Sequence, residues 1–242
     1  SGKRPDRAVI VYSQKCKQAY KDVPLMVGGI EASLRRIAQY DYWSNEIRRS
    51  VLIDSGADIL LYGNAERAIV EFSHEIASGK NVKELQHIRG TAVVRNATPA
   101  GWTEIDSTRI DWPGRLDEIP NPYEMKDTKN QTCSTNGKEG GADEGMEEHE
   151  SVVKIVPMPL HRKLDIDHAK AVIRLPSFEK VRADAALYAH ASRILHLESN
   201  PQNAHALIQR HGDKEIWVNA PPIPLETEEM DAVFALPYKR IA

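Results

Sequence analysis

The sequence contains only two cysteines, Cys16 and Cys133, among 242 residues. They lie far apart in dissimilar surroundings, so we predict neither a disulfide framework nor a cysteine-based metal cluster. An iron–sulfur cluster is usually held by three or four thiolates, so this chain alone cannot hold one. Cys16 is expected to pack as a small apolar side chain.

Long apolar runs and an excess of positive charge are also missing. No stretch approaches the roughly 20 apolar residues that span a bilayer, and residues 1–6 lack the apolar segment of a signal peptide. The formal net charge is -3, which disfavours a nucleic-acid-binding domain. We therefore expect a cytoplasmic protein without a membrane partner, whose ligand is a small molecule or an unknown substrate.

Local catalytic and metal-binding motifs are absent as well. The chain has no GxSxG, no GxGxxG, no Walker-type loop and no HExxH, although it contains nine histidines. His190 falls on the apolar stripe of an expected helix, so a hydrogen-bonded core or interface histidine is the favoured interpretation over a catalyst. We predict no catalytic residue and no metal ligand in this chain.

Strands and helices alternate along the first hundred residues. The patterns predict helices at 5–22, 31–38 and 65–78, and strands at 23–27, 58–62 and 91–95. The apolar run at 8–11 leaves a strand open as the alternative for the first element. This order predicts the α/β class, with a partial doubly wound parallel sheet and crossover helices. Because the sheet is incomplete and the chain begins at Ser1, we expect a fragment whose missing strands lie upstream.

The pattern stops between about 113 and 165, where acids, glycines and polar residues dominate. Such a composition buries too little apolar surface to offset chain entropy, so a disordered insertion or linker is expected. Beyond it we predict a strand at 171–175, helices at 177–198 and 202–211, a strand at 215–219, and a final helix capped by Thr227. We therefore expect three parts. Residues 1–112 form a partial α/β domain, residues 113–165 form the insertion, and residues 166–242 form a segment of helices and strands that leads into a further domain.

Two strand-to-helix turns supply the candidate ligand-binding residues, which are Gly28, Gly29, Ser33, Gly63 and Glu66. Open α/β sheets bind ligands where strands end and helices begin. The alternative is a purely structural turn that needs glycine for its dihedral angles, with Glu66 as a helix cap.

The basic pairs Arg35-Arg36 and Arg48-Arg49 stand in the first fifty residues. They are either solvated or in contact with a neighbouring domain or a ligand phosphate.

Several strings resemble YgiQ-type radical SAM proteins, and the resemblance covers most of the chain outside residues 124–165. They are KRPDRA at 3–8, GGIEASLRR at 28–36, YDYWS at 40–44, LPSFEKV at 175–181, LYAHASRILH at 187–196 and FALPYKR at 234–240.

The resemblance implies an amino-terminal region, similar to a cobalamin-binding domain, that precedes a radical SAM barrel. That downstream barrel would be the partner of this chain. Its CxxxCxxC motif would hold a 4Fe–4S cluster that binds S-adenosylmethionine and generates a 5'-deoxyadenosyl radical. Gly28 and Gly29 match the pocket for a nucleotide tail, but the DxHxxG element with a cobalt-ligating histidine is absent from this chain.

Two other functions stay open. The chain could be a noncatalytic α/β ligand-binding or scaffolding domain, or a hydrolase or transferase of unknown type that uses His190 and Glu66.

Overall fold

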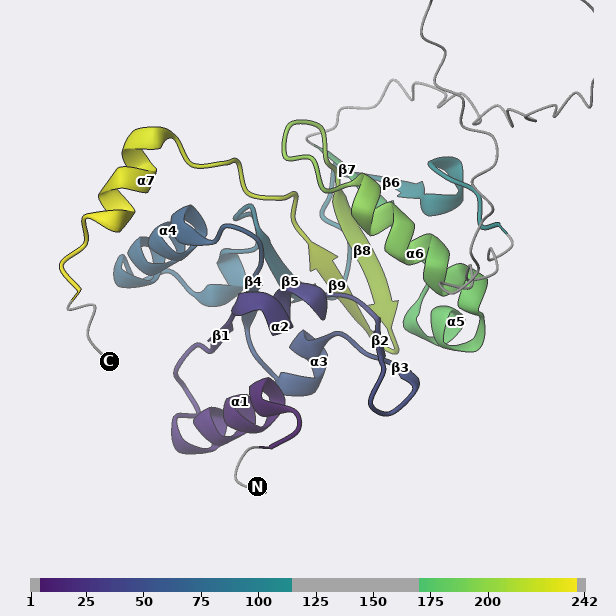
Figure 1. The fold of residues 1–242 in the computed structure, drawn as a ribbon, viewed down its shortest axis with the longest axis horizontal. Coiled ribbons are helices and arrows are strands. Elements are labelled where there is room, and N and C mark those ends of the chain that lie inside the picture. The colour runs from purple at the N-terminus through teal and green to yellow at the C-terminus, as the bar shows by residue number, and fades with distance from the viewer. Residues whose placement is uncertain (1–4, 115–169, 239–242) are drawn as a thin grey trace, which may run out of the picture. The chain divides into compact units, whose positions relative to one another are not determined.

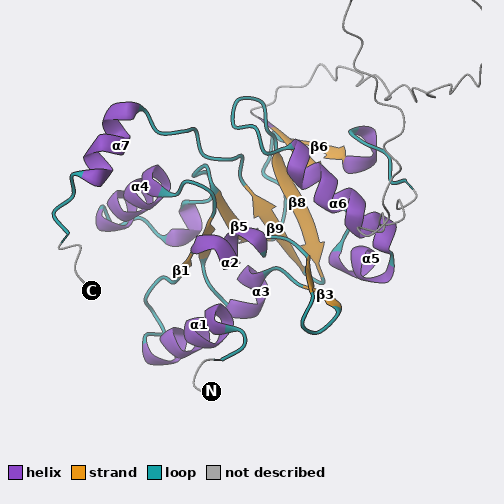
Figure 2. Ribbon diagram, in the orientation of Figure 1, coloured by secondary structure: helices purple, strands orange, loops and turns teal. Residues whose placement is uncertain are grey.

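The computed structural model describes residues 5–114 and 170–238, and these ranges contain a seven-stranded sheet and a two-stranded sheet. Figure 2 shows the strands between helices. The strands are β1 (Met26–Val27), β2 (Gln39–Asp41), β3 (Glu46–Arg48), β4 (Ile59–Leu61), β5 (Thr91–Arg95), β6 (Thr103–Asp106), β7 (Ala171–Arg174), β8 (Ala206–His211) and β9 (Lys214–Val218). The α-helices are α1 (Ala8–Ala19), α2 (Gly29–Leu34), α3 (Val51–Ser55), α4 (Glu66–Ala77), α5 (Phe178–Ala183), α6 (Ala185–Leu197) and α7 (Thr227–Phe234). The 3-10 helices are η1 (Val82–Glu84) and η2 (Ser107–Arg109).

The large sheet has the strand order β1-β4-β5-β9-β8-β7-β6. β1 pairs in parallel with β4, and β6, β7 and β8 form a second parallel group. The pairings β4-β5, β5-β9 and β9-β8 are antiparallel, so the two parallel groups run in opposite directions. The predicted α/β class is confirmed, and the carboxyl ends of the two parallel groups lie at opposite edges of one sheet.

The direction of β5 follows from the chain between α4 and Gly90. After α4 this segment returns to the edge where β4 ends, and the Tyr62 amide donates to the Gly90 oxygen at 2.8 Å. β5 therefore starts beside the end of β4 and runs back along it, with Leu61 opposite Thr91.

Alternate residues of the strands face two separate cores. One core contains Leu60, Ile173 and Leu207, and it is covered by side chains of α2, α3 and α6. The other contains Ile59 and Trp217 and is covered by α4. Figure 1 shows α2, α3 and α6 in front of the strands.

Most predicted elements are present, but the helix predicted at 202–211 is wrong. Residues 206–211 form β8, which pairs with β7 and β9. The continuous buried run Ala206, Leu207 and Ile208 is compatible with a buried strand and with a buried helix segment alike, and the neighbouring strands decide between them. Gly212, expected to end a helix, occupies the tight β8-β9 turn with a φ of 65°.

The single helix predicted at 177–198 is also wrong, because it divides at Asp184. This residue has extended backbone angles, and its side chain accepts a hydrogen bond from the Ala186 amide at 2.8 Å. Asp184 therefore ends α5 and caps α6. Ser177 caps α5 as predicted, whereas the last helix is capped by Glu226 rather than Thr227.

Strands from both the 1–112 and the 166–242 parts share the large sheet, so downstream strands supply the partners that we expected upstream. The predicted insertion lies almost wholly outside the described residues, and the three-part domain division stays a prediction. Cys16 is exposed on α1, which corrects the expectation that it is packed. Within residues 5–114 and 170–238, no helix has the length and apolar character to cross a membrane.

Candidate functional site

A cavity of about 400 Å³ lies at the edge of the sheet where β4 and β9 end. Two of the predicted residues, Ser33 and Gly63, line it, although they are far apart in the sequence. They meet because the end of α2 lies beside the end of β4. The cavity is closed on another side by Pro222 and by Leu195 of α6.

Arg36 is the cationic group of this cavity, and it is the second residue after α2. Its guanidinium carbon lies 4.6 Å from the centre of the Tyr62 ring, and its Nη1 donates to the Ser33 oxygen. The Nε atom is buried and donates to no described group. Burial lowers the pKa of Arg36, and the nearby Tyr62 opposes this shift.

Tyr62 forms the floor under Arg36 at the end of β4. Its hydroxyl donates to the backbone oxygen of Asn219, which follows β9. Burial raises the pKa of the phenol strongly, while Arg36 and Arg89 act in the opposite direction. The ring therefore stays neutral and serves as an aromatic surface for a cation.

Glu198 and His205 form the acidic and imidazole part of the cavity wall. Glu198 Oε2 lies 3.0 Å from His205 Nδ1, and it accepts the His205 amide at 2.6 Å. Both side chains are about nine-tenths buried. The one carboxylate among the described lining residues is therefore engaged within the protein.

The other predicted residues have local structural roles. Gly29 has a φ of 83°, which favours glycine, whereas Gly28 is extended. Gly63 has a φ of 68°, and a Cβ there would lie 3.4 Å from Pro222 Cγ. Glu66 opens α4, does not line the cavity, and has a buried Oε2 atom without a hydrogen-bond partner. Ligand binding by these residues stays a prediction.

Sequence reasoning missed Arg36, Tyr62 and the Glu198–His205 pair as members of one site. The adjacent pair Arg35-Arg36 was the available signal, but its two residues differ. Arg35 binds Glu31 at 2.7 Å one helical turn away, whereas no carboxylate of a described residue lies within salt-bridge distance of Arg36.

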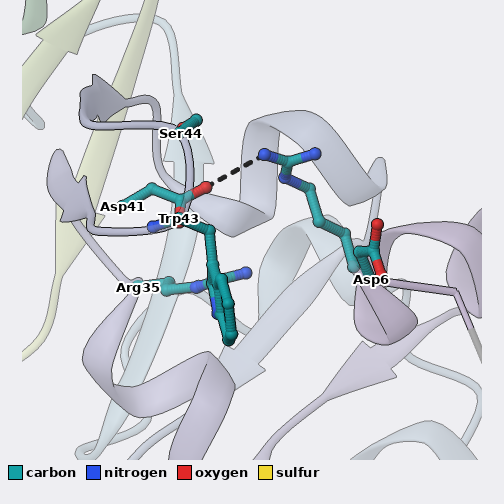
Figure 3. Close-up of a pocket in the computed structure, with 6 residues that line it drawn as sticks. Asp6, Arg35, Asp41, Trp43 and Ser44 are labelled. Carbon is teal, nitrogen blue, oxygen red and sulfur yellow. Dashed lines mark hydrogen bonds and ion pairs between the residues drawn. The ribbon is translucent and has the colours of Figure 1, made fainter.

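A second cavity of about 530 Å³ lies beside the loop between β2 and β3 (Figure 3). Asp41 lines it with a side chain only 2% exposed, and it accepts a hydrogen bond from Arg7 at 3.0 Å. Burial would raise the pKa of Asp41, but hydrogen bonds from Arg7, the Trp43 amide and Ser44 hold it below its usual range. This carboxylate therefore fixes the loop that presents Trp43.

A third cavity lies at the opposite edge, where β6 and β7 end. Arg174, one of the cations that line it, is paired with Glu104 at 2.6 Å and with Glu215 at 2.8 Å. His190 lies nearby in the core with its Nε2 3.0 Å from Ser107 Oγ, as the sequence predicts for a core histidine. Its pKa is lowered by burial, partly offset by Asp111.

Comparison with known proteins places the chain. The family model described as Radical SAM N-terminal matches residues 1–242. The chain belongs to the Radical SAM N-terminal family. It is 56% identical to a UPF0313 protein of Pseudomonas putida over 242 residues and 51% identical to the UPF0313 protein YgiQ of Escherichia coli over 241 residues. All of this chain is covered in both comparisons, but it spans only about 30% of the length of these curated relatives. No solved structure shows a significant match.

A 4Fe–4S cluster does not fit this Radical SAM N-terminal chain. Cys16 stands alone on α1, and Cys133 lies outside the described residues. The part of the chain that the structure describes contains no group of three or more His, Cys, Asp or Glu side chains suited to a metal ion. A cluster usually takes three or four thiolates, so the two cysteines of this chain are too few to hold one.

Proposed function

We propose that this chain is the amino-terminal part of a radical SAM enzyme whose catalytic centre lies in the rest of the full-length protein. That protein would bind a 4Fe–4S cluster and S-adenosylmethionine and generate a 5'-deoxyadenosyl radical. The observation that supports this most directly is the family match over residues 1–242, combined with relatives about three times as long. The two cysteines of this chain leave the cluster ligands to the remainder.

The partner of this chain in the proposal is that remaining polypeptide. The loop between β2 and β3 is suited to such a contact because Trp43 is 80% exposed and its ring centre lies 4.8 Å from that of Tyr42. Arg7 and Arg35 line the adjoining cavity. Tryptophan, tyrosine and arginine are the residues enriched at energetically important interface positions.

The loop is held in place before any partner binds. Asp41 accepts hydrogen bonds from Arg7 and from the Trp43 amide, the latter at 3.1 Å. A preorganised aromatic side chain loses less conformational entropy on docking. The exposed loop therefore supports a docking role toward the rest of the enzyme.

The test compares the full-length protein with the 242-residue chain, both purified without oxygen and treated with iron, sulfide and a reductant. The full-length protein should retain iron and release 5'-deoxyadenosine from S-adenosylmethionine, and the chain alone should do neither. Product formation by the chain alone would refute the placement of the cluster outside it. No product from an iron-loaded full-length protein would refute the radical SAM activity.

A second candidate function is noncatalytic ligand binding or scaffolding. The cavity that contains Ser33, Gly63 and Arg36 favours it, because the partly buried Arg36 lines this cavity without a carboxylate partner among the described residues. Titration of the chain with nucleotides and with cobalamins tests this function. Cobalamin has no support in the geometry, since Gly29 is explained by its backbone angle.

A further inference from the structure

Arg36 is a partly buried arginine at the edge of the sheet where β4 and β9 end. It is one of few charged side chains that line the β4-β9 edge cavity, and it pairs with no carboxylate of the described residues. Its Nη1 has only a neutral acceptor, the Ser33 oxygen, and its buried Nε has none. Buried charges in proteins are as a rule paired or bound to a ligand of opposite charge.

A second arginine stands beside the same cavity. Arg89 donates from Nε to the Pro221 oxygen at 3.0 Å and from Nη2 to the Pro201 oxygen at 2.7 Å, and both prolines line the cavity. Arg89 also has no carboxylate within salt-bridge distance among the described residues. The charge of Arg89 acts electrostatically on Tyr62, whose ring contacts Arg36, and favours a lower pKa of its phenol. Arg89 does not itself line the cavity, but its guanidinium is bonded to the backbone of two residues that do.

Glu198 is the one carboxylate among the described lining residues, and it lies within salt-bridge distance of neither arginine. Glu198 is bound to both the side chain and the amide of His205. By contrast, Arg174 at the opposite edge is paired with Glu104 and with Glu215. Arg36 therefore lacks the carboxylate partners that the cation at the opposite edge has.

The remaining wall combines hydrogen-bond donors with apolar surface. Ser33, Ser199 and Asn64 provide hydroxyl and amide groups, while Leu195 and Pro224 provide apolar contacts. A volume of about 400 Å³ falls within the range of small-molecule sites. Guanidinium groups match the oxygens of phosphate in geometry as well as charge.

We propose that this cavity binds the phosphate group of a small, nucleotide-sized ligand, with Arg36 as the main contact and Arg89 as the second cation. The inference rests on the ligand-binding candidate above and is independent of the radical SAM activity. The phosphate lies against Arg36, and the rest of the ligand follows the Leu195 and Pro224 wall.

Isothermal titration of the 242-residue chain at low ionic strength tests the site, with inorganic phosphate, AMP and adenosine as probes. Inorganic phosphate and AMP should bind saturably and compete with each other, and adenosine, which lacks the phosphate, should bind at least tenfold more weakly than AMP. Affinity should fall as salt is added, because the contact is between charges. Absence of saturable binding by both phosphate and AMP overturns the proposal.

Arg36→Gln should weaken AMP binding at least tenfold. Arg95→Gln is the matched control, because Arg95 is also partly buried, lies 4.3 Å from the centre of the Trp217 ring and has no carboxylate partner among the described residues. Arg95 does not line the cavity, so this variant should bind AMP as the unchanged chain does. Equal binding by both variants, or equal losses in both, overturns the assignment to Arg36.

Arg89→Gln tests the proposed phosphate site if Arg36→Gln does not fold. Arg89 is exposed, so its replacement should leave the fold intact and weaken AMP binding at least threefold. Unchanged AMP affinity in Arg89→Gln overturns the two-arginine site. Release of 5'-deoxyadenosine by the full-length protein is measured separately, so failure of phosphate binding and failure of the radical SAM proposal are distinguishable.

Discussion

The guanidinium carbon of Arg36 lies 4.6 Å from the centre of the Tyr62 ring, which joins the loop after α2 to the end of β4. The Tyr62 hydroxyl extends this connection to Asn219 after β9. One aromatic side chain therefore supports the cation and fixes two strand ends beside the cavity.

Tyr62→Phe should lower the free energy of unfolding by about 1 kcal/mol at neutral pH, the usual contribution of one buried hydrogen bond. The pH dependence gives a sharper test. Because burial raises the Tyr62 pKa, the phenol stays protonated in the folded state while the unfolded chain ionises near its ordinary value. Stability from this group is complete below about pH 10 and is lost as the pH rises further. Urea unfolding at pH 8 to 11 should show a steeper loss for the unchanged chain than for Tyr62→Phe.

His211→Gln should flatten the acid side of the stability profile. Burial lowers the pKa of His211 to about 4, while Glu179 acts in the opposite direction. The unfolded chain takes up this proton near pH 6.5, so stability is complete above that pH and falls as the pH drops toward 4, by roughly 2 to 3 kcal/mol. Urea unfolding between pH 4 and 7 measures the slope. The exposed His74→Gln is the control, and an unchanged slope in His211→Gln would contradict the assignment.

Gly90→Ala should destabilise the chain more than Gly79→Ala. Both glycines have positive φ, 73° and 89°, so both variants incur a similar backbone penalty. A Cβ at Gly90 would lie 3.1 Å from Pro222, whereas none of the neighbouring atoms comes within 4 Å at Gly79. Overpacking of this kind typically costs about 1 to 3 kcal/mol. Thermal unfolding of the two variants isolates the contact with Pro222. Equal losses of stability in both would show that Pro222 moves aside to accommodate the added Cβ.

Trp43→Ala should separate the isolated chain from the full-length protein. In the chain alone Trp43 is 80% exposed, so the change in unfolding free energy should stay within about 0.5 kcal/mol. In the full-length protein an interface anchor should cost about 2 kcal/mol or more. Tyr20→Ala, at a side chain 66% exposed after α1, is the matched control. Identical small effects of Trp43→Ala in both proteins would remove the loop from the docking surface.

Local pattern was enough to predict α1, α4, β4, β5 and β9, because each has a clear apolar period or a short buried run between turn residues. The same information could not place β8, whose spacing suits two structures. It also missed β6 and the β2-β3 hairpin, where polar residues such as Asp41 and Glu104 stand within the strands. β6 is stabilised by pairing with β7, far along the chain, whereas β2 and β3 pair only with each other.

The candidate site, too, could be predicted from the sequence only in part. Gly63 and Ser33 were predicted from turn positions, and the structure brings them to one cavity. Arg36 was seen only as one of two basic residues, since the sequence does not reveal that Arg35 has a carboxylate partner and Arg36 has none. Asn219 and His205 enter the site through β9 and β8, so their placement required the strand order.

The central position of β9 means that the large sheet cannot be completed early in synthesis of the chain. β9 pairs with β5 on one side and with β8 on the other, yet it is the last strand of the sheet to leave the ribosome. Until residues 214–218 emerge, β5 and β8 each expose an unpaired edge, and such edges favour association with other chains. A nascent chain therefore completes its sheet only near the end of this region, and a product that stops before residue 214 would be left as two separate half-sheets.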